Sequence, residues 1–225
     1  MNWLAQLPAI VLPLLFAVTL HEAAHAWVAD KKGDDTARKL GRLSLNPIVH
    51  IEWFGTIIVP FMLFLLTQGA SIFGWARPVP VDARRLRHPK QDMAWVAAAG
   101  PGMNLLLALI TGVLYRLIPV VGPYFYQLLG TDGAVWFLKP ILMMLHFSIH
   151  INLLLMVFNL IPIPPLDGGR ILAGLLPEKQ AGYLHRVEPY GMFLVIFLFY
   201  IDPFHVMFRM INPVIRSFSH ILFGQ

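Results

Sequence analysis

Long apolar segments constrain this chain most, because a helix of about 20 residues crosses a lipid bilayer. Hydrophobic residues make up 57% of the 225 residues and charged residues only 13%, whereas about 25% charged residues is usual in a soluble domain. The segments lie at about 4–28, 53–72, 93–118, 137–160 and 187–201, with a weaker one at about 204–222. The sequence predicts an all-α polytopic membrane protein of about five to six transmembrane helices, in a single domain over 1–225.

Composition narrows the possible chemistry. The chain has no cysteine, which excludes disulfides and thiolate metal sites. The net charge of +5 indicates basic membrane-flanking loops, and no motif points to a nucleic-acid partner. The first apolar segment lacks a basic region before it and continues into a histidine motif. We therefore expect a retained first helix and not a cleaved signal peptide.

The distribution of Lys and Arg in short loops predicts orientation. Basic residues gather at 30–42, at 77–90 and after residue 160, and the connection at 119–136 has none. Simple alternation of spans cannot place the first two basic loops on the same side. We therefore predict that a segment around 74–81 is re-entrant or returns as extended chain against the bundle interior, since its prolines oppose helix. The alternative is an ordinary span followed by a basic loop that breaks the rule.

The stretch "HEAAH" places two histidines and a glutamate near the end of the first apolar segment. His21 and His25 share one face of a helix, so both imidazoles can reach one tetrahedral zinc ion. Glu22 lies beside them and can take a proton from a water on the metal. The alternative is a set of core residues satisfied by neighbouring helices, but ionisable groups inside a membrane are costly and usually functional.

A zinc site needs a third ligand, and without cysteine it must be His, Asp or Glu. Most acidic residues lie in or beside charged loops. Asp167 instead ends the apolar run "LLLMVFNLIPIPPLDGGR", whose three closely spaced prolines predict an extended arm and whose glycines permit a sharp turn. We predict one zinc per chain, held by His21, His25 and Asp167 about 10–15 Å below the cytoplasmic surface.

These two motifs together resemble the site-2 protease family of intramembrane zinc metalloproteases. "AGPGMN" (99–104) is similar to that family's A-G-P-x-x-N segment, and "GWARPVPVD" (74–82) to its membrane-embedded strand region. The resemblance covers about residues 12–190 and implies a minimal branch without a PDZ or CBS domain. It implies a catalytic core over about 4–175, C-terminal helices over about 185–222, and Glu22 as the general base.

Several other residues are candidates for supporting roles. Asn104 is predicted to donate to the oxyanion or to a ligand, with a helix–helix hydrogen bond as the alternative. Asn159 is predicted to orient Asp167 or hold substrate backbone, with helix capping as the alternative. The edge formed by Val79, Pro80 and Val81 is predicted to receive substrate by strand addition.

The remaining histidines favour structural readings. His146 and His150 repeat the i, i+4 spacing without a glutamate, and interhelical hydrogen bonding is the preferred interpretation over an auxiliary metal or proton site. His50 is interpreted as a loop histidine. The segment at 203–222 suits either an interfacial helix or a span.

The function predicted by the resemblance is hydrolysis of a peptide bond within or near the transmembrane helix of a single-span membrane protein. The predicted location is a bacterial inner (cell) membrane, with the site open to the cytoplasm. Alternatives are a polytopic metal-binding or transport protein that uses the same histidines, an inactive protease relative that binds membrane helices, and another class of membrane zinc protease. Glu22 and the proline arm favour the first reading, and no repeat of broken helices supports transport.

Overall fold

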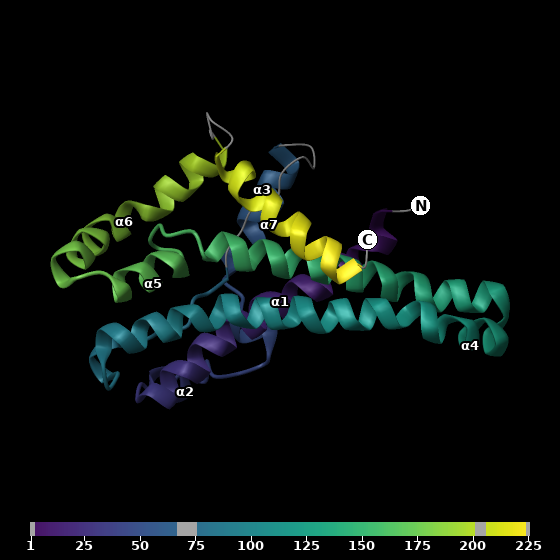
Figure 1. Ribbon diagram of the computed structural model, residues 1–225, viewed down its shortest axis with the longest axis horizontal. Coiled ribbons are helices and arrows are strands. Elements are labelled where there is room, and N and C mark those ends of the chain that lie inside the picture. Colours follow the sequence, from purple (N-terminus) through teal and green to yellow (C-terminus); the bar gives the residue numbers. More distant parts are fainter. Residues whose placement is uncertain (1–2, 67–75, 201–205, 224–225) are drawn as a thin grey trace.

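The computed structural model describes residues 3–66, 76–200 and 206–223, and within them every regular element is a helix (Figure 1). Two described helices are long and apolar enough to cross a membrane. They are Pro8–Lys32, which forms most of α1 (Trp3–Lys32), and α4 (Pro89–Asn159). The predicted all-α class is confirmed, and the count of five to six spans stays a prediction.

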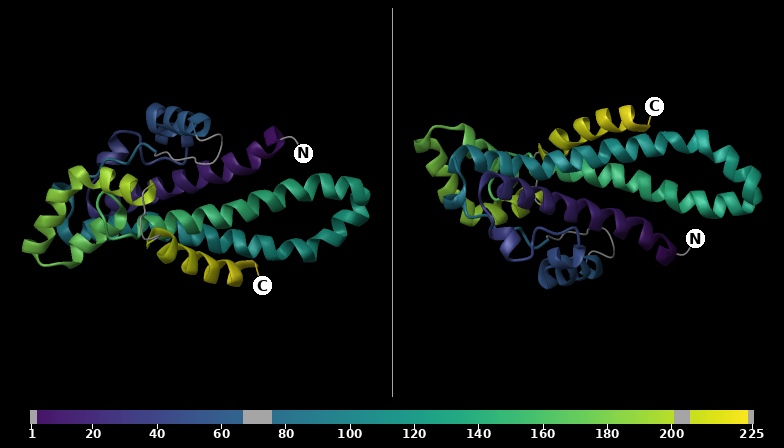
Figure 2. Two further views of the ribbon diagram at one scale, coloured as in Figure 1. Left: turned by 90° about the horizontal axis from the view of Figure 1, so that it is seen from above. Right: turned by 90° about the horizontal axis from the view of Figure 1, so that it is seen from below.

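α4 is a hairpin whose two arms run antiparallel (Figures 1 and 2). Its helical backbone is interrupted at Gly130, where φ is 69° and ψ is 177°, a conformation that glycine adopts without steric cost. The predicted connection at 119–136 is therefore helical on both sides of one glycine. The turn lies inside the predicted connection, and only the predicted segment ends at 118 and 137 differ, because the apolar residues of this stretch continue both arms.

α1 packs against α4, and its N-terminal end lies short of the hairpin turn (Figure 2). Small side chains on the packed face let two helix backbones approach closely, as is common between membrane helices. Ala17 of α1 is fully buried, and its carbonyl accepts a hydrogen bond from Asn104 of α4, whereas Ala26 packs instead on Ala37 and Val79. This close approach brings the histidine pair of α1 against the first arm of α4.

After α4 the chain leaves helical geometry at Leu160 and forms an irregular arm that includes the cis Pro164–Pro165 bond. α5 (Asp167–Leu175) begins directly after the arm, and α6 (Glu178–Tyr200) begins earlier than the apolar pattern at 187 predicted. α7 (Val206–Phe223) packs against α4, with Leu222 in a cluster with Ala108, Ile149 and Leu153. α7 is not among the described helices that could span a membrane.

The predicted 53–72 segment begins with a wide helical turn (Trp53–Ile58) that continues as α3 (Val59–Leu66). Its last residues, and the first two of the predicted 74–81 segment, lie outside the described residues. From residue 76 to 82 the chain forms no helix or strand, and Asp82 at its end has β-region dihedral angles. We call this stretch the extended segment, since its two prolines favour extended chain in the residues before them. Val79 within it is buried against Ala26 and Ala37. The short helix α2 (Thr36–Lys39) and single turns at Pro47–His50 and Ala83–Arg85 complete the described elements.

Buried carboxylates connect the loop after α1 to the chain that enters α4. Asp34 is fully buried and accepts hydrogen bonds from the Thr36 N–H at 3.1 Å and the Asp82 N–H at 2.7 Å. Asp92, also buried, lies 2.9 Å from the Lys32 ammonium. Since buried acidic groups are stable only when paired, these contacts fix the extended segment relative to the histidine helix.

Candidate active site

The structure brings His21, His25 and Asp167 together in one buried group, although about 140 residues separate the motifs. The two Nε2 atoms are 3.0 Å apart, and Asp167 Oδ2 lies 3.3 Å from each of them. Four-coordinate zinc with ligands at about 2.0–2.1 Å has ligand–ligand separations of about 3.3–3.4 Å. The observed triangle is therefore close to one face of a zinc tetrahedron.

The other ring nitrogen of each histidine faces an acceptor on α4. His25 Nδ1 lies 2.6 Å from the Val96 carbonyl oxygen, which can only accept, so this Nδ1 carries the proton. His21 Nδ1 lies 2.6 Å from Asn104 Oδ1. Both Nε2 atoms therefore carry the electron pair that binds a metal, and the acceptors fix the ring orientation.

Asn104 is fully buried, and its hydrogen bonds fix the orientation of its amide. The Nδ2 group donates to Asn152 Oδ1 at 2.9 Å and to the Ala17 carbonyl at 3.3 Å, which leaves Oδ1 for His21. Asn152 in turn donates to the Ser148 carbonyl at 2.9 Å. Asn104 therefore makes the helix–helix hydrogen bonds of the alternative interpretation and also contacts His21. Its role toward the oxyanion stays a prediction.

Two observations show that the three ligands suit a metal ion. Asp167 Oδ2 is buried and has no hydrogen-bond partner among the described residues, which is costly unless a cation balances it. Gly100 faces the space between the rings, since a Cβ there would lie 2.4 Å from His25 Nε2 and 2.6 Å from His21 Nε2. Two imidazoles and one carboxylate are a donor set typical of catalytic zinc.

Close backbone contacts hold Asp167 in place. A Cβ at Gly168 would lie 2.3 Å from the Leu160 carbonyl oxygen, and one at Gly169 would lie 2.4 Å from Pro164 N. Gly191 of α6 covers the other side, since a Cβ there would lie 1.8 Å from the Pro164 carbonyl oxygen. The predicted bent arm is therefore clamped between α5 and α6 by glycines.

Glu22 is half-buried beside the ligands, and Oε2 accepts a hydrogen bond of 2.8 Å from the Val79 N–H. Arg42 contributes positive charge nearby, and its Nη1 is buried without a partner among the described residues. Burial and the neighbouring Arg77 lower the pKa of Arg42, whereas Glu22 raises that pKa. One basic and one acidic side chain thus flank the extended segment next to the ligands.

Other predicted residues lie outside the ligand group. The side chain of Asn159 donates to the Leu155 carbonyl of its own helix at 3.0 Å, and its roles toward Asp167 or substrate stay predictions. His50 is buried, with Nε2 2.9 Å from the Ser44 carbonyl oxygen. Pro80 and Val81 continue the extended segment, and the side chain of Val81 packs on the cluster around Val79.

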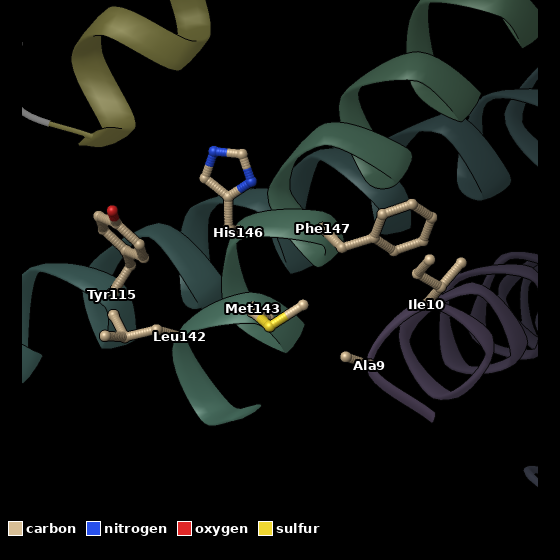
Figure 3. Close-up of a pocket in the computed structure, with 7 residues that line it drawn as sticks. All are labelled: Ala9, Ile10, Tyr115, Leu142, Met143, His146 and Phe147. Atoms are coloured by element: carbon tan, nitrogen blue, oxygen red, sulfur yellow. The ribbon is translucent and has the colours of Figure 1, made fainter. Parts of the chain in front are cut away.

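His146 and His150 form no ligand group with a third residue among those described. Their rings stack on Phe223 of α7, and His150 Nδ1 lies 2.9 Å from the His146 carbonyl of the same helix. His146 also lines a largely apolar cavity of about 410 Å³ between α1 and α4 that contains none of the proposed ligands (Figure 3). Within the described part of the chain, the interhelical contact of these rings is stacking on Phe223, and the hydrogen bond of His150 stays within its own helix.

Sequence patterns did not indicate Val96, Gly100, Asn152 or Gly191 as site residues. The Val96 carbonyl and the Gly100 Cα are backbone groups, so the residue types at these two positions give little indication of a role in the site. Gly100 does lie in the "AGPGMN" match, and Asn152 is a polar residue in an apolar segment. Such isolated polar residues in a predicted span are the one signal that could have indicated Asn152.

A helical membrane bundle that buries an H-E-x-x-H helix against a distant aspartate defines a membrane metallopeptidase of the site-2 type. The family model described as "Peptidase family M50" matches residues 9–131 and 120–201. The chain therefore belongs to peptidase family M50, the site-2 protease family, as its motifs predicted.

Curated relatives agree with this assignment. The chain is 38% identical over 224 residues to "Putative zinc metalloprotease YwhC" of Bacillus subtilis, covering 97% of this chain and 94% of that protein. It is 28% identical to "Putative zinc metalloprotease Rip2" of Mycolicibacterium smegmatis, covering 82% of this chain and 63% of that protein. It is 29% identical to "Zinc metalloprotease MJ0392" of Methanocaldococcus jannaschii, covering 80% of this chain and 38% of that protein. The comparison with solved structures found no significant match.

Proposed function

We propose that this protein is an intramembrane zinc metalloendopeptidase that hydrolyses a peptide bond within or near the transmembrane helix of a single-span membrane protein. The observation that carries the proposal is the buried triangle of His21, His25 and Asp167 with Glu22 beside it. One zinc per chain bound there would polarise the scissile carbonyl and lower the pKa of its water. Membership of the family supports this reading.

The chain's own residues perform the remaining steps. Glu22 takes a proton from the attacking water and delivers it to the leaving amine. Asn104 and the Val96 carbonyl keep the imidazoles in the ligand tautomer and orientation. Packing of the proline arm between α5 and α6 presents the Asp167 carboxylate without a large reorganisation. The proposal gives no role to nucleic acid.

We place the domain in the lipid bilayer of a bacterial inner (cell) membrane, as one unit over 1–225 with five to six spans and the site open to the cytoplasm. Basic residues at 30–42 and 77–90 support this orientation. The ligand group lies at the same end of the bundle as these loops. At that end Asp34 accepts a hydrogen bond from the Asp82 N–H and Asp92 pairs with Lys32, and these two contacts connect the loops. The opposite end is the hairpin turn of α4 at Gly130.

Substrate would lie along the extended segment by strand addition. The Arg77 N–H donates inward to the His50 carbonyl at 2.9 Å, and the Val79 N–H donates inward to Glu22. Pro78 and Pro80 have no N–H. Because N–H and C=O groups alternate along extended chain, this segment would receive substrate N–H groups through its outward carbonyls.

Turnover by a Glu22→Gln variant tests the proposed function. We expect detergent-purified wild type to cut β-casein or a helical single-span peptide, and Glu22→Gln to be about 10²–10⁴-fold slower while it keeps its zinc. Equal turnover by the two proteins would remove Glu22 from the mechanism. Zinc-loaded wild type that cuts neither probe nor any single-span protein trapped by Glu22→Gln would favour a helix-binding or transport role.

The absence of cysteine allows a clean test of the docking segment. A single cysteine at position 78, which is exposed on the extended segment, should form disulfides with a cysteine placed near the scissile bond of the substrate. A cysteine at position 128, which is exposed near the hairpin turn, is the matched control. Equal cross-linking at both positions would contradict docking along the extended segment.

A further inference from the structure

The hydrogen bond between Glu22 and Val79 joins the predicted general base to a main-chain group 57 residues further along the chain. Its length of 2.8 Å is in the range expected for a charge-assisted bond to a carboxylate. No motif in the sequence assigns a role to this amide, because a main-chain N–H has no side-chain signature. The contact lies next to the ligand triangle, since His21 and Glu22 are consecutive on α1.

The sequence around Val79 leaves a single donor at this position. Pro78 and Pro80 flank it, and neither has an N–H. Both prolines also restrict their own φ angles and disfavour helix in the residue before them. The Val79 N–H is therefore the one backbone donor between Arg77 and Val81, and it is presented on a stiff, extended chain.

The segment that carries this donor is fixed on both sides. Before Val79, the Arg77 N–H donates to the His50 carbonyl at 2.9 Å. After it, the Asp82 N–H donates to the buried Asp34 carboxylate at 2.7 Å. The Val79 side chain is 8% exposed and packs on Ala26, which lies one turn after Glu22 on α1. Donor and acceptor are thus held by the same packed surface.

We propose that the Val79 N–H is the positioning donor for Glu22: it holds Oε2 and leaves Oε1 to take the proton of the attacking water. Val79 is a positioning residue, since it acts through Glu22 and does not touch the reacting atoms. The inference rests on the proposed function. Its physical basis is that a carboxylate on a rotatable side chain loses efficiency as a base when its orientation is not fixed.

A bond that merely anchored the extended segment would behave differently. In that case its loss would loosen the segment, weaken substrate binding and lower stability, as any break along 76–82 would do. A positioning bond instead affects the rate of the bound complex, with zinc and substrate affinity retained. The two readings are therefore separated by kcat, KM and zinc content measured on the same variants.

The first experiment compares Val79→Pro with Val81→Pro in β-casein cleavage. Val79→Pro removes the donor from a chain that is already extended, and we expect kcat to fall at least about tenfold with KM within about twofold and zinc retained. Val81→Pro alters the same segment without removing the bond to Glu22, so its defect should appear in KM. Val79→Ala, the conservative variant that keeps the N–H, should recover most of the lost kcat. Zinc loss in Val79→Pro, or the same kinetic defect in both proline variants, would overturn the proposal.

The second experiment needs no substrate, so it separates this inference from the proposed function. In zinc-loaded protein labelled with ¹⁵N-valine, the Val79 amide should exchange slowly with solvent. Glu22→Ala should speed this exchange at least about tenfold, whereas Asn159→Ala should leave it as in wild type. Slow exchange that persists in Glu22→Ala would overturn the proposal even if wild type is an active protease.

Discussion

Two histidine pairs in this chain have the same spacing and different surroundings. His21 and His25 lie one turn apart on α1 with ring centroids 4.6 Å apart, and His146 and His150 lie one turn apart on α4 with centroids 4.5 Å apart. The first pair is buried, whereas His146 is exposed and His150 half-buried. Helical spacing alone therefore produces the pair and not the site.

The partners of the rings make the difference. The Nδ1 atoms of the first pair face acceptors on another helix, and an aspartate approaches both Nε2 atoms. In the second pair, His150 Nδ1 faces the carbonyl of its own helix and the rings stack on Phe223. A metal site in this fold thus requires acceptors and a third ligand from other elements.

Closing the space between the first pair should have the largest effect. Gly100→Ala places a Cβ within 2.6 Å of both Nε2 atoms, so we expect zinc content below about a tenth of wild type, because a packed site cannot absorb the added atom. Gly102→Ala is the matched control in the same helix, since a Cβ there meets nothing within 4 Å. Normal zinc content in Gly100→Ala, measured by mass spectrometry, would show that the ligand triangle is not the zinc site.

Removing an acceptor should have an intermediate effect. Asn104→Ala leaves the His21 Nδ1–H unpaired, and we expect zinc to bind about 10–100-fold more weakly. Competition with a chelator of known affinity gives this value. Asn159→Ala, which removes only a bond within its own helix, should keep wild-type affinity. Equal affinity in both variants would refute the orienting role of Asn104.

Displacing the aspartate arm should have a smaller effect. Gly191→Ala would push on the Pro164 carbonyl, and we expect destabilisation of about 1–3 kcal/mol with zinc affinity reduced by less than about tenfold, since the arm can move slightly. Gly182→Ala on the same helix has open space and serves as the control. Thermal unfolding and chelator competition give the two values, and identical behaviour of the variants would contradict the clamp.

Removing the second pair should have the smallest effect. His146→Ala combined with His150→Ala should keep about one zinc per chain and wild-type zinc affinity, because no third ligand joins this pair among the described residues. Loss of zinc from this double variant would show that the comparison between the pairs is wrong.

Much of the site could be predicted because its chemistry is carried by side chains in local patterns. "HEAAH" specifies two ligands and a base by helical spacing, and the three prolines before Asp167 indicate a bent arm. The rest depends on tertiary contacts. The packing of α1 against α4 and the extended segment determines which carbonyl contacts His25, which Cα faces the rings and which N–H donates to Glu22.

The fold shows the same division. Apolar runs predicted the helices, and the prolines together with the distribution of basic residues predicted the extended chain near residue 79. The apolar runs did not predict that the two arms of α4 continue to Gly130, because apolar residues with a few prolines are compatible with either a loop or a helix end. The early start of α6 was not predicted either, because its first turns are polar and precede the apolar segment that begins at about 187.

Zinc content is the most direct test of the central claim that His21, His25 and Asp167 form one metal site. Mass spectrometry should be applied to detergent-purified wild type, His25→Ala, Asp167→Ala and, as the control, His150→Ala, all checked for folding. We predict about one zinc per chain in wild type and His150→Ala, and a sharp loss in both His25→Ala and Asp167→Ala. Zinc retained by folded Asp167→Ala would mean another third ligand, and folded wild type that binds no supplied zinc would contradict the account.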